Sequence, residues 1–292
     1  MRSFDYIESG KTLLTPHTTS LLAAIHEAKG RQSIQTTIRP DILGTLVAVA
    51  RIQSTDASNR IEGISTSDSR LNDLVSEKVT PRNRNEEEIA GYRDALSVIH
   101  ESHDYIPITP NVILQLHRDL FRHTPLTFAG HFRDSDNVII ERDAHGTSTV
   151  RFAPPSALVT PELIERACSA YTQAIRDGHT DPLLAIAMFI LDFTCIHPFN
   201  DGNGRMSRLL TLLMLCRNGY MVGKCISIEH LIEQSKSTYY EALAASTQAG
   251  TTTPMIMRHS RTTCLASYCP RARNSTNASI SRQAAERREH RE

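Results

Sequence analysis

The sequence predicts a mainly α-helical protein with one small β-hairpin. Apolar residues recur at helical spacing along most of the 292-residue chain. Residues 124–156 break that spacing, because prolines and glycines there punctuate two short β-prone runs. Forty per cent of the residues are hydrophobic and 22% are charged, which is typical of a globular protein with one large domain or two modest ones.

Helix-capping residues and chain breakers indicate where the predicted helices begin and end. Thr18 or Thr19 can cap a helix that Gly30 ends, and Asp41 can cap the next one. A polar segment without apolar periodicity follows over residues 53–69. The remaining helices are expected over residues 85–102, 109–120, 161–177, 182–196, 203–217 and 228–246. The hairpin is expected to join residues 137–140 to residues 149–152.

Charge and cysteine usage narrow the class of protein. Lys plus Arg balances Asp plus Glu, 32 against 32, which argues against a general nucleic-acid or membrane-surface binder. No signal-peptide pattern is visible at the N-terminus, and no apolar run approaches the roughly 20 residues that span a bilayer. The six cysteines form no C-x-x-C pair, so we expect reduced thiols and a cytoplasmic protein.

Composition divides the chain into three parts. We expect an N-terminal helical region over residues 1–105, a catalytic core over 106–250 and an atypical basic tail over 251–292. From Arg258 onward the tail contains arginine but no lysine, and its apolar periodicity is poor. Three interpretations of the tail stay open: a disordered segment, a reading-frame shift near residue 250, and a nucleic-acid-binding arm.

The richest chemistry lies between residues 195 and 210. An apolar helix ends at His197-Pro198, as expected before a proline, and a turn containing Gly202 and Gly204 leads into the next helix. Free backbone N–H groups and the helix dipole favour a phosphate at such a helix start.

The side chains around this turn suit nucleotide chemistry. Arg205 and Arg208 lie three residues apart and can project from one helix face toward an anion. Asp201 offers a hard oxygen ligand for Mg²⁺, and the imidazole of His197 can take a proton from a hydroxyl near neutral pH. A zinc site is not expected, because no second His or Cys lies at ligand spacing from His197.

Residues 197–208 read HPFNDGNGRMSR, which matches the whole Fic motif, H-P-F-x-(D/E)-G-N-G-R-x-x-R. The sequence therefore resembles the Fic family, and the resemblance implies a Fic-type helical bundle that transfers AMP from ATP to a protein hydroxyl. It implies that His197 is the general base and that Asp201 holds Mg²⁺ on the α- and β-phosphates. The phosphate-binding residues that it implies are Asn200, Asp201, Gly202, Asn203, Gly204, Arg205 and Arg208.

Residues 130–155 resemble the Fic flap, whose strand edge binds a segment of the target protein. Val138 replaces a Trp and Ile140 replaces a Gly that are frequent in the family, and the insert over 141–151 is longer and more charged than in the family pattern. The mode of target docking is therefore the part of the resemblance that carries over least to this chain. The flap residues expected beside the nucleotide are Asn137, Val138, Ile139 and Ile140.

Two further resemblances concern adenine and regulation. Tyr239 and Tyr240 resemble the paired tyrosines of the adenine pocket, with one expected in the core and one near the nucleotide. Residues 58–63, SNRIEG, resemble the inhibitory motif (S/T)-x-x-x-E-(G/N), with Ser58, Glu62 and Gly63 at its fixed positions. By the family pattern Glu62 pairs with Arg208 and denies that arginine to the γ-phosphate of ATP.

Three functional hypotheses stay open. The first is an autoinhibited protein adenylyltransferase that acts on Tyr, Thr or Ser and also labels itself. The second is an enzyme of the same fold that removes AMP or transfers another phosphate-containing group. The third is a Fic-fold regulator that has lost activity. The oligomeric state, monomer or homo-oligomer, stays open, although regulated members of the family often self-associate. A membrane partner or nucleic acid is not expected.

Overall fold

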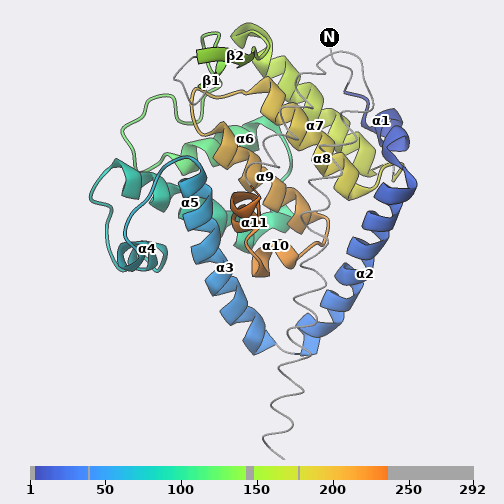
Figure 1. The fold of residues 1–292 in the computed structure, drawn as a ribbon, viewed down its shortest axis with the longest axis horizontal. Helices are drawn as coiled ribbons and strands as arrows, with labels where there is room; N and C mark the ends of the chain where they lie inside the picture. Colours follow the sequence, from blue (N-terminus) through green and yellow to red (C-terminus); the bar gives the residue numbers. More distant parts are fainter. Residues whose placement is uncertain (1–3, 39, 143–147, 177, 236–292) are drawn as a thin grey trace, which may run out of the picture.

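A computed structural model describes residues 4–38, 40–142, 148–176 and 178–235 (Figure 1). Within those residues the protein is helical apart from one hairpin, which confirms the predicted fold class. The helices are α1 (Tyr6–Leu13), α2 (Pro16–Ile38), α3 (Pro40–Ile61), α4 (Asp68–Val75), α5 (Arg84–Ser102), α6 (Pro110–Leu120), α7 (Thr160–Arg176), α8 (Pro182–Ile196), α9 (Asn203–Arg217), α10 (Val222–Cys225) and α11 (Ile228–Gln234). Short 3-10 turns are η1 (His103–Tyr105) and η2 (Ala157–Val159).

The hairpin consists of β1 (Ile139–Arg142) and β2 (Ser148–Phe152), which pair antiparallel. An irregularity between Ile139 and Ile140 shifts the register, so that Ile139 pairs with Phe152 and Ile140 with Val150. In Figure 1 the hairpin lies at one end of the helical bundle, next to α7.

Local capping explains the starts of α6 and α8, which lie where the sequence predicts. The side chain of Thr109 accepts a hydrogen bond from the backbone N–H of Val112 at 3.4 Å, and Asp181 accepts one from Leu183 at 2.9 Å. Both helices have proline in the first turn, where its missing N–H costs nothing. Cap and proline together fix the first residue of each helix.

The N-terminal region differs from the sequence prediction. The helix α1 is not predicted, and α2 begins before both predicted caps, because Thr15 accepts the N–H of Thr18 at 3.2 Å instead. The same helix continues through Gly30, since one glycine lowers helix propensity by only about 1 kcal/mol relative to alanine.

The polar segment over residues 53–69 is also more helical than its apolar spacing indicates. Its first part extends α3 to Ile61, and its last residues begin α4. Polar side chains of α3 face the bundle and are at most 2% exposed, so the buried face has no apolar period to detect. These residues are Ser54, Thr55, Ser58 and Asn59.

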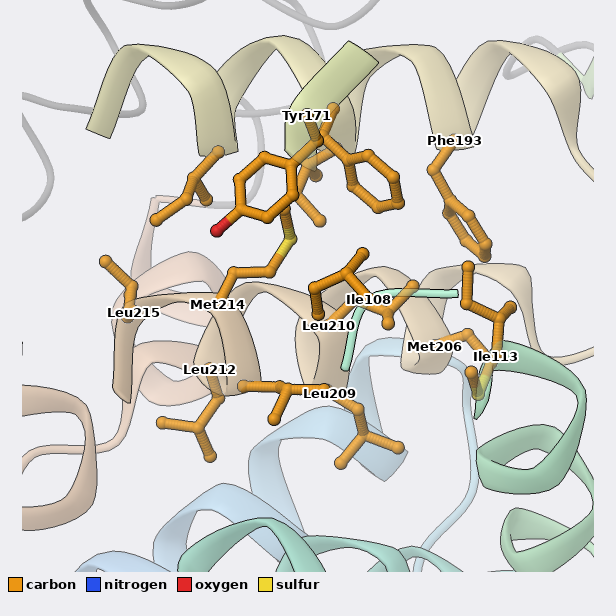
Figure 2. Close-up of a cluster of buried hydrophobic side chains, with 14 of the residues drawn as sticks. Ile108, Ile113, Tyr171, Phe193, Met206, Leu209, Leu210, Leu212, Met214 and Leu215 are labelled. Carbon is orange, nitrogen blue, oxygen red and sulfur yellow. The ribbon is translucent and has the colours of Figure 1, made fainter. Parts of the chain in front are cut away.

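The core surrounds α9, which is buried on nearly every side. Leu209 and Leu213 of this helix have no exposed surface, and each fully buried leucine side chain contributes about 1.5–3 kcal/mol. Figure 2 shows Tyr171 of α7 and Phe193 of α8 on one side of this helix. Residues from Tyr6 to Ile232 join the same cluster, so the N-terminal region and the predicted catalytic core share one core. No helix in the described ranges has the length and apolar content needed to cross a membrane.

Candidate active site

The loop between α8 and α9 carries the motif. His197 ends α8 in the left-handed conformation, with φ of 51°, and Gly202 precedes α9 with φ of 79°. A side chain at Gly202 would be strained at that φ and would also press on the ring of Phe121. The glycine therefore allows the chain to enter α9 with its first N–H groups directed at the loop.

Asn203 closes this loop from within. Its Nδ2 donates to the carbonyl oxygen of Phe199 at 2.7 Å, and its Oδ1 accepts from the N–H of Phe199 at 3.0 Å. The side chain is buried, so its amide supports the loop instead of facing solvent. The family resemblance assigns this side chain to the anion cradle, whereas the hydrogen bonds assign it a structural task.

His117 of α6 supports the loop from a neighbouring helix. Its Nδ1 accepts the N–H of Gly130 at 2.9 Å, so its Nε2 carries the proton and donates to the carbonyl oxygen of Asp201 at 3.1 Å. Burial lowers the pKa of His117 to about 4, which keeps the ring neutral near pH 7. Sequence reasoning missed this residue, because an isolated histidine on a helix carries no motif.

His197 is prepared to act as a base. Burial lowers the pKa of His197, and the charge of Arg133 lowers it further. A hydrogen bond with the backbone of Thr194 acts in the opposite direction, but the net shift is downward, so the imidazole is neutral near pH 7. A neutral ring beside the loop can accept a proton from an incoming hydroxyl.

Arg133 joins the hairpin segment to the motif. Its Nε donates to the carbonyl oxygen of His197 at 3.0 Å, and its backbone N–H donates to that of Pro198 at 2.9 Å. The two Nη atoms donate to the carbonyl oxygens of Ser135 and Pro155, one on each side of the hairpin. The flap-like stretch of the sequence contains this arginine, but nothing in its pattern gave the residue a role.

Arg208 is held by the end of α3. Its Nε donates to Ser58 Oγ at 2.8 Å, and its Nη2 donates to the Ser58 carbonyl oxygen at 3.0 Å and to Glu62 Oε1 at 2.7 Å. Arg208 is 3% exposed, whereas the side chain of Glu62 is 34% exposed. The expected contact between Glu62 and Arg208 is present, and Gly63 is the next residue after Glu62.

The Glu62 carboxylate also lies against the start of α9. Gly204 stands in the first turn of that helix, and a side chain there would collide with Glu62 Oε1. A negative group therefore already stands where the N–H groups and the dipole of α9 favour an anion. The close approach requires glycine at position 204.

Arg205 faces a different helix. Its Nη2 lies 2.7 Å from Glu88 Oε2 on α5, and its guanidinium stacks over the ring of Phe121 with 5.0 Å to the centroid. The side chain is 1% exposed. The sequence spacing predicts that both motif arginines project together toward an anion, but each is buried against its own glutamate.

Asp201 stands at the exposed lip of the loop. Its side chain is 48% exposed, and its Oδ1 accepts the N–H of Gly202 at 2.6 Å, while Oδ2 lies 4.0 Å from Arg84 Nη2. Mg²⁺ usually takes one or two carboxylates together with phosphate oxygens and water. The donor set therefore fits a cation that arrives with a nucleotide, and no group of three or more ligand side chains in the described ranges could hold a metal alone.

For the remaining predicted site residues that it describes, the structure gives positions along the chain. Asn200 is exposed beside Asp201, and the hairpin places Asn137 and Val138 before β1, with Val138 50% exposed. Ile139 and Ile140 belong to β1. Several predictions fall outside the described residues: Tyr239 and Tyr240 of the adenine pocket, the second half of the helix over 228–246, and the tail over 251–292.

Comparison with known proteins agrees with this geometry. Residues 107–215 match the Fic/DOC family. The protein adenylyltransferase fic-1 of Caenorhabditis elegans is 29% identical over 145 residues, which cover 47% of this chain and 25% of the nematode protein. A Fido domain-containing protein of Dictyostelium discoideum is 37% identical over 90 residues, which cover 30% of this chain and 58% of that protein. The chain thus spans only part of the length of each curated relative.

The fold is found in a solved structure as well. A Fic family protein from Desulfovibrio desulfuricans superposes with a TM-score of 0.71 at 23% identity, covering 91% of this chain and 76% of the other. At that identity the likeness concerns the fold alone. Together with the family match and the complete motif at the start of α9, it identifies residues 107–215 of this chain as a Fic domain of the Fic/DOC family.

Proposed function

We propose that this chain is a protein adenylyltransferase, which transfers AMP from ATP to a Tyr, Thr or Ser hydroxyl of a protein, and that Glu62 inhibits it in cis. The observation that carries the proposal is the meeting of a neutral His197 with the start of α9 and Arg208. The name of the nematode relative, a protein adenylyltransferase, supports the same reaction.

The reaction is a displacement at the α-phosphorus. The acceptor hydroxyl oxygen forms a bond to this phosphorus while its proton passes to the imidazole of His197. The bond from the α-phosphorus to the oxygen that bridges to the β-phosphate breaks, and pyrophosphate leaves. Backbone N–H groups at the start of α9 stabilise the phosphate charge, and positioning supplies much of the catalysis.

Asp201 is the residue that would hold Mg²⁺, because its carboxylate is half exposed at the lip of the loop. When bound, Mg²⁺ neutralises charge on the α- and β-phosphates. Asn203 and His117 keep the loop in shape around that carboxylate. These supports reduce the reorganisation that the loop needs when ATP binds.

Inhibition follows from two contacts of one carboxylate. Glu62 bonds Arg208 and also fills the space over Gly204, so the γ-phosphate meets neither a free cation nor an open helix start. Like charges repel there as well, because phosphate and carboxylate compete for one place. Relief of the inhibition therefore requires the end of α3 or the Glu62 side chain to move away from Arg208 and Gly204.

The target docks on the hairpin in this proposal. The described sheet has two strands, so β1 has one edge that pairs with no described strand. An extended segment of the target can add to that edge through backbone hydrogen bonds. Arg133 ties the segment before β1 and the segment after β2 to the motif, which brings the added strand close to His197.

Incubation with ATP labelled at the α-phosphate tests the proposal. Glu62→Gly is expected to raise the amount of labelled protein, including the chain itself, and Glu62→Gly with His197→Ala is expected to give none. Glu77→Gly is a matched control, because Glu77 is also an exposed glutamate just past a helix. Unchanged labelling in Glu62→Gly would contradict the inhibition. Nucleotide binding without any transfer would contradict the enzymatic activity, and hydrolytic release of AMP from a labelled target would favour the alternative of an enzyme that removes AMP.

A further inference from the structure

Glu88 of α5 faces two arginines at once. Its Oε1 accepts a hydrogen bond from Arg84 Nε at 2.9 Å, and its Oε2 lies 2.7 Å from Arg205 Nη2. The Glu88 side chain is 4% exposed, so one buried carboxylate serves two guanidinium groups. Glu88 lies outside residues 107–215, which match the family.

The same two arginines flank Asp201. Arg84 Nη2 lies 4.0 Å from Asp201 Oδ2, and Arg205 Nη2 lies 4.0 Å from Asp201 Oδ1. Both distances are too long for a hydrogen bond, so each arginine is attracted by Asp201 without bonding to it. Both make their short contact with Glu88 instead.

The side chains of the two arginines differ in how freely they can change rotamer. Arg205 is 1% exposed and is packed over Phe121, so it has little room to turn. The side chain of Arg84 is 64% exposed at the first residue of α5, where a long arginine side chain can readily change its rotamer. Without the charge of Glu88, the nearest carboxylate for Arg84 is Asp201.

We propose that Glu88 is a positioning residue of the nucleotide site, which holds Arg84 and Arg205 off Asp201 and so keeps that carboxylate available to the divalent cation of the nucleotide complex. The inference rests on the proposed function, in which Asp201 is the cation ligand. Glu88 acts only through the two arginines and does not touch the cation or ATP. It also balances two positive charges that would otherwise repel a cation beside them.

Direct binding of Mn²⁺ tests the inference without any turnover. The probe is Mn²⁺ with a non-hydrolysable ATP analogue, and free Mn²⁺ is measured by electron paramagnetic resonance on the full chain. Every variant carries Glu62→Gly, so that inhibition does not enter the comparison. Circular dichroism and thermal unfolding verify that each variant is folded.

Glu88→Gln is expected to raise the Mn²⁺ dissociation constant about fivefold, which is the size of one favourable exposed ion pair gained by Asp201. Adding Arg84→Ala to Glu88→Gln is expected to restore most of the affinity, because the mobile competitor is then gone. Glu87→Gln removes the same charge one residue away on α5 and is expected to leave the affinity unchanged.

Two results would overturn the inference. One is an unchanged Mn²⁺ affinity in folded Glu88→Gln, and the other is a loss that Arg84→Ala does not restore. If Glu88→Gln does not fold, Arg84→Ala alone decides, because it keeps the buried pair of Glu88 and Arg205. It is expected to tighten Mn²⁺ binding about twofold, and unchanged or weaker binding would contradict the inference. Absence of Mn²⁺ binding in the unsubstituted Glu62→Gly chain would instead overturn the proposed function, and this inference with it.

Discussion

The rings of His117 and Phe199 lie parallel, with 3.7 Å between their centroids and 2° between their planes. The first belongs to α6 and the second to the motif loop. Hydrogen bonds of the same histidine reach Gly130 and Asp201, so a single neutral ring connects the start of the flap-like segment to the loop. The shape of the loop therefore depends on a residue 84 positions before Asp201, which only the fold brings into contact with it.

Substitution of His117 is expected to slow AMP transfer. His117→Phe can keep the ring stack but loses both hydrogen bonds, and a loop displaced by a fraction of an ångström costs about tenfold to a hundredfold in rate. His117→Gln retains one donor and one acceptor and is expected to recover part of the rate. Labelling rates in the Glu62→Gly background measure both. Equal rates in the two variants would contradict a positioning role.

Arg133→Lys is expected to impair use of the protein target more than binding of ATP. A lysine ammonium cannot reach the carbonyl oxygens of His197, Ser135 and Pro155 together, because it lacks the planar fork of arginine. The Michaelis constant for the target is therefore expected to rise, while calorimetry finds ATP affinity within about twofold of the parent chain. A loss of ATP affinity larger than the loss of target use would contradict this division.

Ser58→Ala is expected to raise AMP transfer, but by less than Glu62→Gly. Arg208 then loses the Ser58 hydroxyl but keeps the Ser58 carbonyl oxygen and the Glu62 carboxylate. A hydrogen bond to a charged group contributes about 1.5–3 kcal/mol, so the inhibited state is weakened without being abolished. Ser54→Ala, on the same helix and also buried, serves as the control. A rise as large as that of Glu62→Gly would mean that Ser58 alone holds Arg208.

His100 is expected to make the protein less stable in weak acid. Burial lowers the pKa of His100 to about 4 from its ordinary 6.5, so the unfolded chain binds this proton first as the pH falls. The contribution of neutral His100 to the free energy of unfolding is fully present above pH 6.5. It is lost progressively toward pH 4, by about 1 kcal/mol per pH unit near pH 5. Denaturant unfolding of His100→Gln should give a shallower slope over that range.

The motif could be predicted from the sequence because its chemistry is contiguous. His197, Asp201 and Arg208 lie within twelve residues, and the breakers around them define where α8 ends and α9 begins. The pairing of Glu62 with Arg208 was also predictable, since SNRIEG matches a known pattern. The contiguous motif can be interpreted from its own residues, whereas the pairing of Glu62 with Arg208 comes from the resemblance to the family pattern.

The supports of the motif could not be predicted in the same way. Arg133, His117 and Glu88 are single residues on separate elements, and only packing brings them to the loop. The buried polar face of α3 escaped detection as well, because apolar periodicity is blind to hydrogen-bonded serine and asparagine. Tertiary contacts between elements decide these features, and local sequence patterns do not record them.

The contact between Glu62 and Arg208 joins two segments of one polypeptide. On the proposed mechanism, diluting or concentrating the protein therefore leaves the blocked fraction unchanged, unlike inhibition by a separate molecule. Only the nucleotide concentration and the strength of the contact enter the balance. A tenfold rise in ATP offsets about 1.4 kcal/mol of that contact. The amount of protein in a cell would thus set how many sites exist, while α3 sets how many of them are open.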